Sequence, residues 1–151
     1  MDNKVFTRIA VGSDHAGFNL KTHMIEWLKE RGFEVIDCGC YSPESVDYPD
    51  IAETTCKEVT SGNAECALLI CGTGIGISIA ANKVKGIRAA LCTDCFSTKY
   101  TRLHNDANAI CFGARVLADG VCEELLSIFL TTPFEGGRHQ RRIDKIAAIE
   151  A

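Results

Sequence analysis

Short apolar runs and longer stretches with helical apolar spacing alternate along this chain. The runs predict strands over 7–13, 34–38, 67–71, 87–92 and 108–112. Helical spacing predicts helices over 18–31, 50–60, 76–84, 95–103 and 138–149, and another that ends at Leu130. Such alternation builds a parallel sheet covered on both faces. We therefore expect an α/β fold: a Rossmann-like, doubly wound five-stranded parallel sheet in a three-layer α/β/α sandwich.

Sheets of this kind bind ligands beyond the carboxyl ends of their strands. Asp14 and His15 follow the first predicted strand, and Cys71 to Gly76 follow the third. We expect the stretch around residues 102–105 to lie at the same edge. These three segments are the first places to look for chemistry.

Length and composition narrow the class of protein. With 151 residues, 46% hydrophobic and 24% charged, the chain is expected to form a single domain over 1–151. No apolar run approaches the roughly 20 residues that span a bilayer, and the N-terminus lacks a signal-peptide core. A cytoplasmic protein is expected. The net charge of −4 gives no reason to expect nucleic acid or a membrane as partner.

Nine cysteines are an odd count, and most of them lie in or beside apolar stretches. We therefore expect reduced cysteines packed in the core. Cys92 and Cys95 have the C-x-x-C spacing of a redox pair or half a zinc site. No second pair completes a tetrahedral ligand set, so no metal is expected, while a redox role stays open.

Cys71 ends an apolar run and is followed at once by Gly72, Gly74 and Gly76. A helix that begins at this turn would place its positive end at the sulfur and favour the thiolate. The glycine-rich loop offers backbone donors for a phosphate or an oxyanion, although its spacing is not that of a dinucleotide fingerprint. Cys71 is thus a candidate base or nucleophile. The alternative is an ordinary buried cysteine, with Thr73 capping the helix.

Three other segments contain polar residues that have either a functional or a purely structural interpretation. Asp14 could accept a substrate hydroxyl or cap the first helix, and His15 could donate to a phosphate or transfer a proton. His104 opens a polar cluster before a strand, which is also typical of a solvated turn. Arg138 and Arg142 are four residues apart and share a helix face that suits a phosphate. A solvated basic face is the alternative, but the preceding glycine pair and His139 favour binding.

Several motifs, in this order, resemble the type B ribose-5-phosphate isomerases of the sugar-phosphate isomerase family, which also includes galactose-6-phosphate isomerase. The resemblance extends nearly from end to end. It rests on Gly12-Ser-Asp-His-Ala-Gly17, Ser45-Val-Asp-Tyr-Pro49, the segment 70–82 around the glycine loop, Gly86-Ile-Arg-Ala-Ala90, His104-Asn-Asp-Ala-Asn108, Phe112-Gly-Ala-Arg115 and Gly136-Gly-Arg-His-Gln-Arg-Arg142.

The resemblance implies an isomerase without metal or cofactor that interconverts ribose 5-phosphate and ribulose 5-phosphate through a cis-enediolate. The family's cysteine base, which moves a proton between C1 and C2, falls on Cys71. Some members use a glutamate a few residues later in the loop. Ile75 and Gly76 stand there in this chain, so the cysteine version is expected.

The resemblance also assigns the other site residues. His104 would assist opening of the furanose ring, with Asp14 at the ring oxygen or a hydroxyl. The remaining roles would be shared as follows: Thr73 and the amides of Gly72, Gly74 and Gly76 on the enediolate; Tyr48 and Asn105 along the sugar; His15, Arg138, Arg142 and Arg115 on the phosphate, with His139 among the substrate-binding residues.

Family members are dimers or tetramers with sites shared between subunits. A homodimer or homotetramer is therefore expected, with the helix at about 138–149 packing on a partner subunit. Which of Arg115, Arg138 and Arg142 act across the interface stays open. Three alternatives also remain: an isomerase of allose or galactose 6-phosphate, a non-catalytic sugar-phosphate sensor, and a cysteine redox protein.

Overall fold

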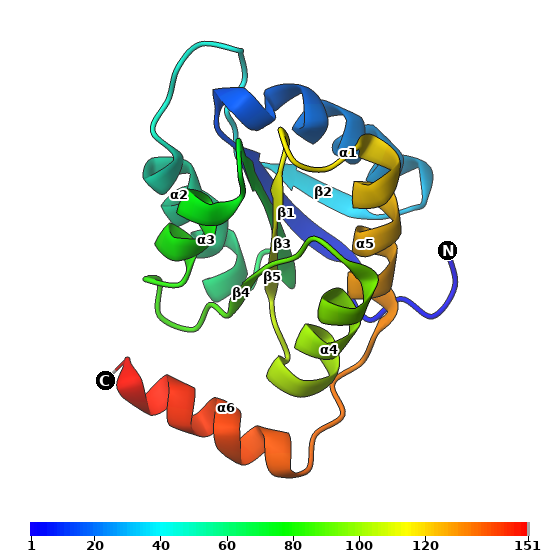
Figure 1. The fold of residues 1–151 in the computed structure, drawn as a ribbon, viewed down its shortest axis with the longest axis vertical. Coiled ribbons are helices and arrows are strands. Elements are labelled where there is room, and N and C mark those ends of the chain that lie inside the picture. Colours follow the sequence, from blue (N-terminus) through cyan, green and yellow to red (C-terminus); the bar gives the residue numbers. More distant parts are fainter. Residues whose placement is uncertain (151) are drawn as a thin grey trace.

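Five parallel strands form the central sheet of the computed structural model, which describes residues 1–150 (Figure 1). Their order across the sheet is β2-β1-β3-β5-β4, so the predicted five-stranded parallel sheet is confirmed. The strands are β1 (Arg8–Ser13), β2 (Glu34–Asp37), β3 (Cys66–Cys71), β4 (Ala89–Leu91) and β5 (Ala109–Gly113).

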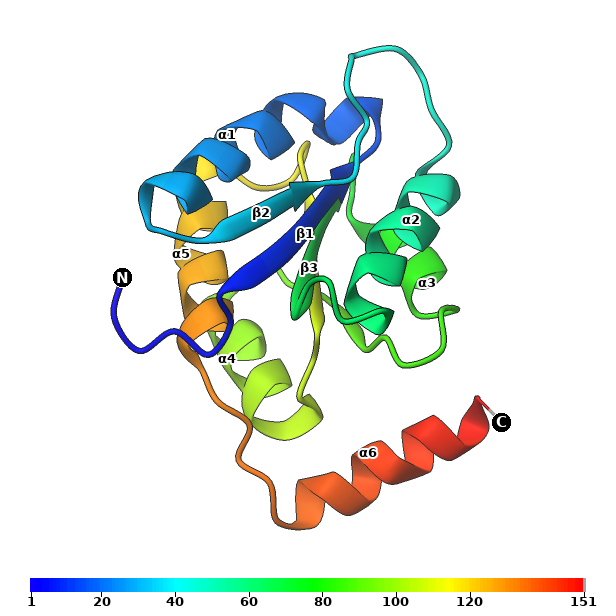
Figure 2. The same cartoon turned by 180° about the vertical axis from the view of Figure 1, so that it is seen from behind.

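Helices cover both faces of this sheet, which confirms the three-layer arrangement (Figures 1 and 2). One face carries α1 (Phe18–Glu30), which follows a 3₁₀ turn at His15–Gly17, together with α4 (Cys95–Asn105) and α5 (Asp119–Thr131). The other face carries α2 (Tyr48–Thr60) and α3 (Ile75–Ala81). The sixth helix, α6 (Arg138–Ile149), stands apart from both layers.

Alternation along β3 divides the core into two clusters. Leu68 and Ile70 pack with the side chains of α1 and α5, whereas Ala67, Leu69 and Cys71 pack with those of α2 and α3. Successive strand residues point to opposite faces, and both faces are covered, so the whole strand is buried. The Cys71 side chain therefore faces the α2 and α3 layer, at the carboxyl end of a central strand.

Several predicted boundaries were wrong by one to three residues. The second helix begins at Tyr48 rather than 50, because Pro49 fits the first turn of a helix. The helix predicted to reach 84 ends at Ala81, and the Asn82 side chain there exchanges hydrogen bonds of 2.8 and 2.9 Å with the Ala89 backbone. These bonds hold the next segment as a turn, and the following strand is shortened to 89–91.

The two ends of the sheet carry different residues. Helix α4 runs from the carboxyl end of β4 back to the amino end of β5, so His104 and Asn105 lie at the amino end (Figures 1 and 2). Cys71 pairs with Gly113 and Ala67 with Ala109, so the strands alone separate the two ends by about 13 Å. The prediction that residues 102–105 share the carboxyl edge was therefore wrong, since this stretch precedes a strand instead of following one.

Helix α6 lies across the amino end of the sheet (Figure 1). Its last turn returns to the domain, where the Glu150 carboxylate accepts the N–H of Gly86 at 3.1 Å. A cavity of about 590 Å³ lies between α6 and the domain, with Ile146 and Ile149 on one side and Arg88 and Asn105 on the other. No helix among residues 1–150 combines the length and apolar character needed to cross a bilayer.

Candidate active site

The turn after β3 places backbone donors beside a buried sulfur. Cys71 is 5% exposed, and the N–H of Gly74 donates to its Sγ at 3.2 Å. Gly74 has φ +79°, and a Cβ there would lie 2.8 Å from the backbone carbon of Phe112. Only glycine fits this turn without strain. The sequence thus fixes a thiol at the point where α3 begins.

Thr73 lies at the exposed tip of the same turn. Its Oγ1 accepts the N–H of Ile75 at 3.2 Å, but the N-cap residue of α3 is Gly74, so Thr73 is not the helix cap considered from the sequence. The hydroxyl hydrogen stays available to a ligand at the loop, because this contact uses only an acceptor lone pair.

Asp14 and His15 lie beside this turn. The Asp14 N–H donates to the carbonyl of Ile70 at 3.1 Å, which joins the ends of β1 and β3. Asp14 is 6% exposed, and its Oδ1 accepts the N–H of Gly17 at 3.1 Å, so one oxygen caps the 3₁₀ turn that precedes α1 rather than α1 itself. His15 Nδ1 accepts the N–H of Val46 at 3.2 Å. That bond holds the loop after β2 against the site.

Tyr48 and Arg115 cover the glycine loop from two sides. A Cβ on Gly76 would lie 2.6 Å from Cζ of Tyr48, so the phenol ring rests on the loop backbone. A Cβ on Gly72 would lie 3.1 Å from Nη1 of Arg115, whose own N–H donates to the Gly72 carbonyl at 3.0 Å. Arg115 therefore reaches the loop of its own chain. The carboxyl-edge group consists of Asp14, His15, Tyr48, Cys71–Gly76 and Arg115.

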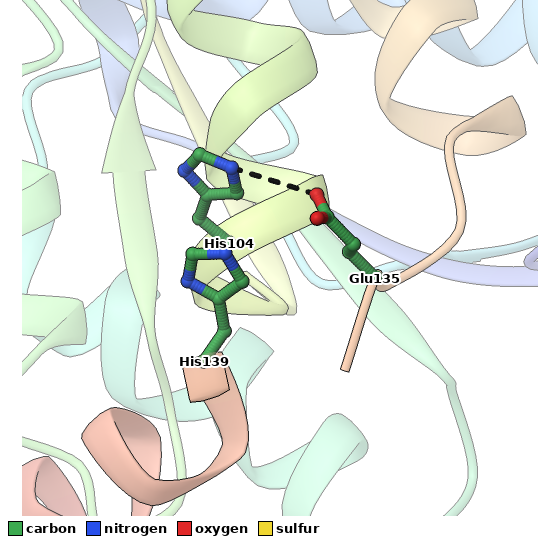
Figure 3. A group of neighbouring side chains, drawn as sticks. All are labelled: His104, Glu135 and His139. Atoms are coloured by element: carbon green, nitrogen blue, oxygen red, sulfur yellow. Dashed lines mark ion pairs between the residues drawn. The ribbon is translucent and has the colours of Figure 1, made fainter. Parts of the chain in front are cut away.

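A second group, the amino-end group, lies where α4 ends and α6 begins. It consists of His104, Asn105, Arg138, His139 and Arg142. The His104 and His139 rings stack with centroids 4.0 Å apart and planes 13° apart (Figure 3). The Tyr100 ring packs edge to face against the His104 ring, with the two ring centroids 5.0 Å apart. The structure therefore brings the predicted residues together as two groups at opposite ends of the sheet.

His139 anchors the amino-end group. Its side chain is 4% exposed, and its Nε2 has no hydrogen-bond partner among residues 1–150. Burial lowers the pKa of His139 below the usual 6.5, with further lowering from His104 and the two flanking arginines, Arg138 and Arg142. At neutral pH the ring is therefore uncharged. Arg138 and Arg142 are exposed, so their cationic ends are free to meet an anion.

Glu135 is a site residue that sequence reasoning missed. It stands directly before the glycine pair that marked the basic cluster, and its Oε2 lies 3.6 Å from Nε2 of His104 (Figure 3). A single carboxylate in a loop carries no signal in the sequence. Only the fold brings it to a residue 31 positions away.

One set of potential metal ligands occurs among residues 1–150: His104, Glu135 and His139, whose ligand atoms lie within 4.8 Å of one another. A metal ion binds in the plane of an imidazole ring, and two nearly parallel stacked rings cannot both direct a lone pair at one ion. Arg138 and Arg142 add positive charge nearby. The arrangement therefore does not fit a metal.

The cysteines divide by their surroundings. All nine are free thiols, and seven of them are buried, as predicted. Burial raises the pKa of Cys56 to about 12 and that of Cys38 to about 11, so these thiols stay protonated at neutral pH. In the C-x-x-C pair, Cys92 is buried and Cys95 is exposed.

Comparisons with known proteins place this fold in a known family. Residues 9–146 match the family model described as Ribose/Galactose Isomerase. The ribose-5-phosphate isomerase B of Escherichia coli (strain K12) is 47% identical over 143 residues, or 95% of this chain and 96% of that protein.

Solved structures give the same result. Ribose-5-phosphate isomerase B of Clostridium thermocellum has a TM-score of 0.94 at 48% identity, covering 95% of this chain and 97% of that one. The type B enzyme of Trypanosoma cruzi has a TM-score of 0.91 at 48% identity, covering 95% and 97%. The fold and site thus define an isomerase of the α/β class. This chain belongs to the ribose/galactose isomerase family.

Proposed function

We propose that this protein is a ribose-5-phosphate isomerase that interconverts ribose 5-phosphate and ribulose 5-phosphate, with Cys71 as the base. The observation that carries the proposal is the donor arrangement at the sulfur, where the Gly74 N–H points at Cys71 Sγ from 3.2 Å at the start of α3. Family membership supplies the reaction class. The substrate comes from the names of the similar proteins from Escherichia coli and Clostridium thermocellum.

The isomerisation is a proton shift between two carbons. The Cys71 thiolate takes the proton from C2 of the open-chain aldose and returns it to C1, while the C2 hydroxyl loses a proton and O1 gains one. The intermediate is a cis-enediolate, whose oxygens carry negative charge. Preorganised donors contribute roughly 3 to 4 kcal/mol each in comparable sites. Thr73 and the amides of Gly72, Gly74 and Gly76 supply such donors at the sulfur.

Ring opening comes first, since ribose 5-phosphate is mainly a furanose. Breaking the C1–O4 bond removes a proton from O1 and adds one to O4. Asp14 takes the hydroxyl proton, and His104 assists at the ring oxygen. Tyr48 and Asn105 line the sugar between them, and His15, Arg115, Arg138 and Arg142 hold the phosphate, with His139 packed behind His104.

Two copies of the chain are needed to assemble this set. His104 and Cys71 lie at opposite ends of the sheet within one copy. Exposed apolar residues near the edge strand β4, including Ile79, Leu91 and Phe96, offer a surface for a second copy. We assign Arg115 to the site of its own chain and the amino-end group to the site of the partner. Symmetric pairing then completes two sites in a homodimer, or in a homotetramer built from such dimers.

Helix α6 is the segment that reaches the partner in this arrangement. Ile146 and Ile149 are exposed on it, and the cavity of about 590 Å³ beneath it is room for a segment of the second copy. Side chains and backbone amides of the two groups carry the whole reaction in this scheme, with no cofactor. A cytoplasmic location, where thiols stay reduced, belongs to the same proposal.

A hexose-6-phosphate isomerase is the second candidate, because the description of the matched family includes galactose. One extra carbon would lengthen the pocket and leave the chemistry unchanged. The amino-end and carboxyl-edge groups are both present on one chain, so identical copies can complete the site, which favours the ribose reaction named for the similar proteins.

A direct assay tests both candidates. The purified protein is incubated with ribose 5-phosphate, allose 6-phosphate or galactose 6-phosphate in the presence of a chelator, and ketose formation is measured. We expect the highest kcat/KM on ribose 5-phosphate. A higher value on either hexose phosphate would assign the second candidate, and no ketose from any of the three would overturn the isomerase proposal.

A further inference from the structure

Glu135 is held against the turn of α4 that carries His104. Its N–H donates to the carbonyl of Leu103 at 3.0 Å, which fixes the Glu135 backbone next to the histidine. Its carboxylate Oε2 lies 3.6 Å from His104 Nε2, an ion-pair separation. The Glu135 side chain is half-exposed, so a small rotation brings the two atoms to hydrogen-bond length. Catalytic contacts often tighten in this way when a substrate binds.

The His104 ring is contacted on three sides. His139 stacks on one face at 4.0 Å, Tyr100 meets the ring edge to face, and Glu135 lies at Nε2. The second ring nitrogen, Nδ1, points away from the carboxylate (Figure 3). A carboxylate accepts N–H, so it fixes the proton of the neutral ring on Nε2 and leaves Nδ1 to exchange a proton.

We propose that Glu135 is a positioning residue for His104: its carboxylate holds Nε2–H, and this contact presents Nδ1 to the ring oxygen of the sugar. The inference rests on the proposed isomerase function, since it gives His104 a furanose to open. The chemistry is that of a carboxylate that orients a histidine and selects its tautomer. His139 keeps the imidazole plane in place, and Glu135 sets which nitrogen faces the substrate.

The kinetic test separates ring opening from isomerisation. 4-Deoxyribose 5-phosphate lacks the hydroxyl that closes the furanose, so it reaches the enzyme as an open chain. We expect Glu135→Leu to lower kcat/KM on ribose 5-phosphate about tenfold and on the deoxy analogue less than about twofold. Glu135→Gln, which keeps an acceptor oxygen, restores most of the loss. Equal losses on the two substrates would overturn the proposal.

A matched control is Glu30→Leu, the same change at an exposed glutamate on α1 that forms an ion pair with Arg31. Its kcat/KM stays within about twofold of wild type on ribose 5-phosphate. A loss in this variant equal to that in Glu135→Leu would mean that removing a surface charge is enough, and would contradict a specific role for Glu135.

Nitrogen NMR provides a readout that does not depend on activity. The ¹⁵N chemical shifts of the two His104 ring nitrogens report the tautomer of the uncharged ring. We expect the Nε2–H tautomer in the wild type and a mixture of the two tautomers in Glu135→Leu. A wild-type ring protonated on Nδ1 would refute the inference even if the enzyme is active. If the wild type does not isomerise ribose 5-phosphate, the proposed function fails; if it does and Glu135→Leu matches it in rates and tautomer, only this inference fails.

Discussion

The carboxyl-edge group and the amino-end group are built by different means. Cys71 and Asp14 are buried and held by the backbone of the central strands, where the turn at Gly74 leaves no room for a Cβ. Arg138 and Arg142 instead stand exposed on a helix that lies apart from the layers (Figure 2). The proposed base is thus fixed by the core, whereas the position of the proposed phosphate-binding residues depends on what α6 contacts. In the proposed site, each group is completed by the other group of a second copy.

The largest effect is expected at the carboxyl edge. Cys71→Ala removes the proposed base and should lower kcat at least about 1000-fold, within the range for acid–base groups. Binding of an unreactive sugar phosphate, measured by calorimetry, stays within about threefold of wild type, since the phosphate contacts remain. The exposed Cys95→Ala serves as control and keeps wild-type activity. Equal loss of turnover and binding would contradict the role as base.

The free energy of unfolding distinguishes the tightly packed turn at Gly74 from the open turn at Gly62. Gly74→Ala places a methyl group 2.6 Å from Leu91 Cδ1 and 2.8 Å from the Phe112 backbone, at φ +79°. Gly62→Ala has the same strain, at φ +85°, with nothing within 4 Å. We expect the free energy of unfolding to fall by about 3 kcal/mol in the first and about 1 kcal/mol in the second. Urea denaturation measures both, and equal losses would mean that the turn is not tightly packed.

At the amino end, the effect should appear in substrate binding. Arg142→Ala should raise KM for ribose 5-phosphate about tenfold with kcat changed less than about twofold, because a charged hydrogen bond to phosphate is lost. Arg141→Ala, its exposed neighbour, is the matched control and leaves KM near the wild-type value. The assignment of Arg142 to the phosphate would be wrong if both variants bound substrate equally well.

The smallest effect concerns pH. Burial lowers the pKa of His139 from 6.5, so below that pH the unfolded chain binds more protons at this residue than the folded chain. Stability from His139 is therefore complete above pH 6.5 and falls as the pH drops below it. His139→Gln should reduce the loss of Tm between pH 7 and pH 5.5. An unchanged pH dependence of Tm in this variant would exclude burial of a neutral imidazole.

Strand and helix order could be predicted because buried parallel strands are continuous apolar runs and their covering helices are amphipathic. The position of His104 could not. Helix α4 has 11 residues and is about 16 Å long, which is enough to carry its last turn from one end of the sheet to the other. Glu135 was missed for a related reason. It lies in the loop before α6, and only the path of that loop in the fold brings it to His104.

Complementation between two inactive variants tests the central claim, that Cys71 of one copy works with His104 of another. Cys71→Ala and His104→Asn chains are coexpressed with different affinity tags, and the mixed dimer is purified through both. One of its two shared sites then has both residues intact, so we expect about half of the wild-type activity. Activity no higher than that of either variant alone would show that each site is built from a single chain and would contradict the account.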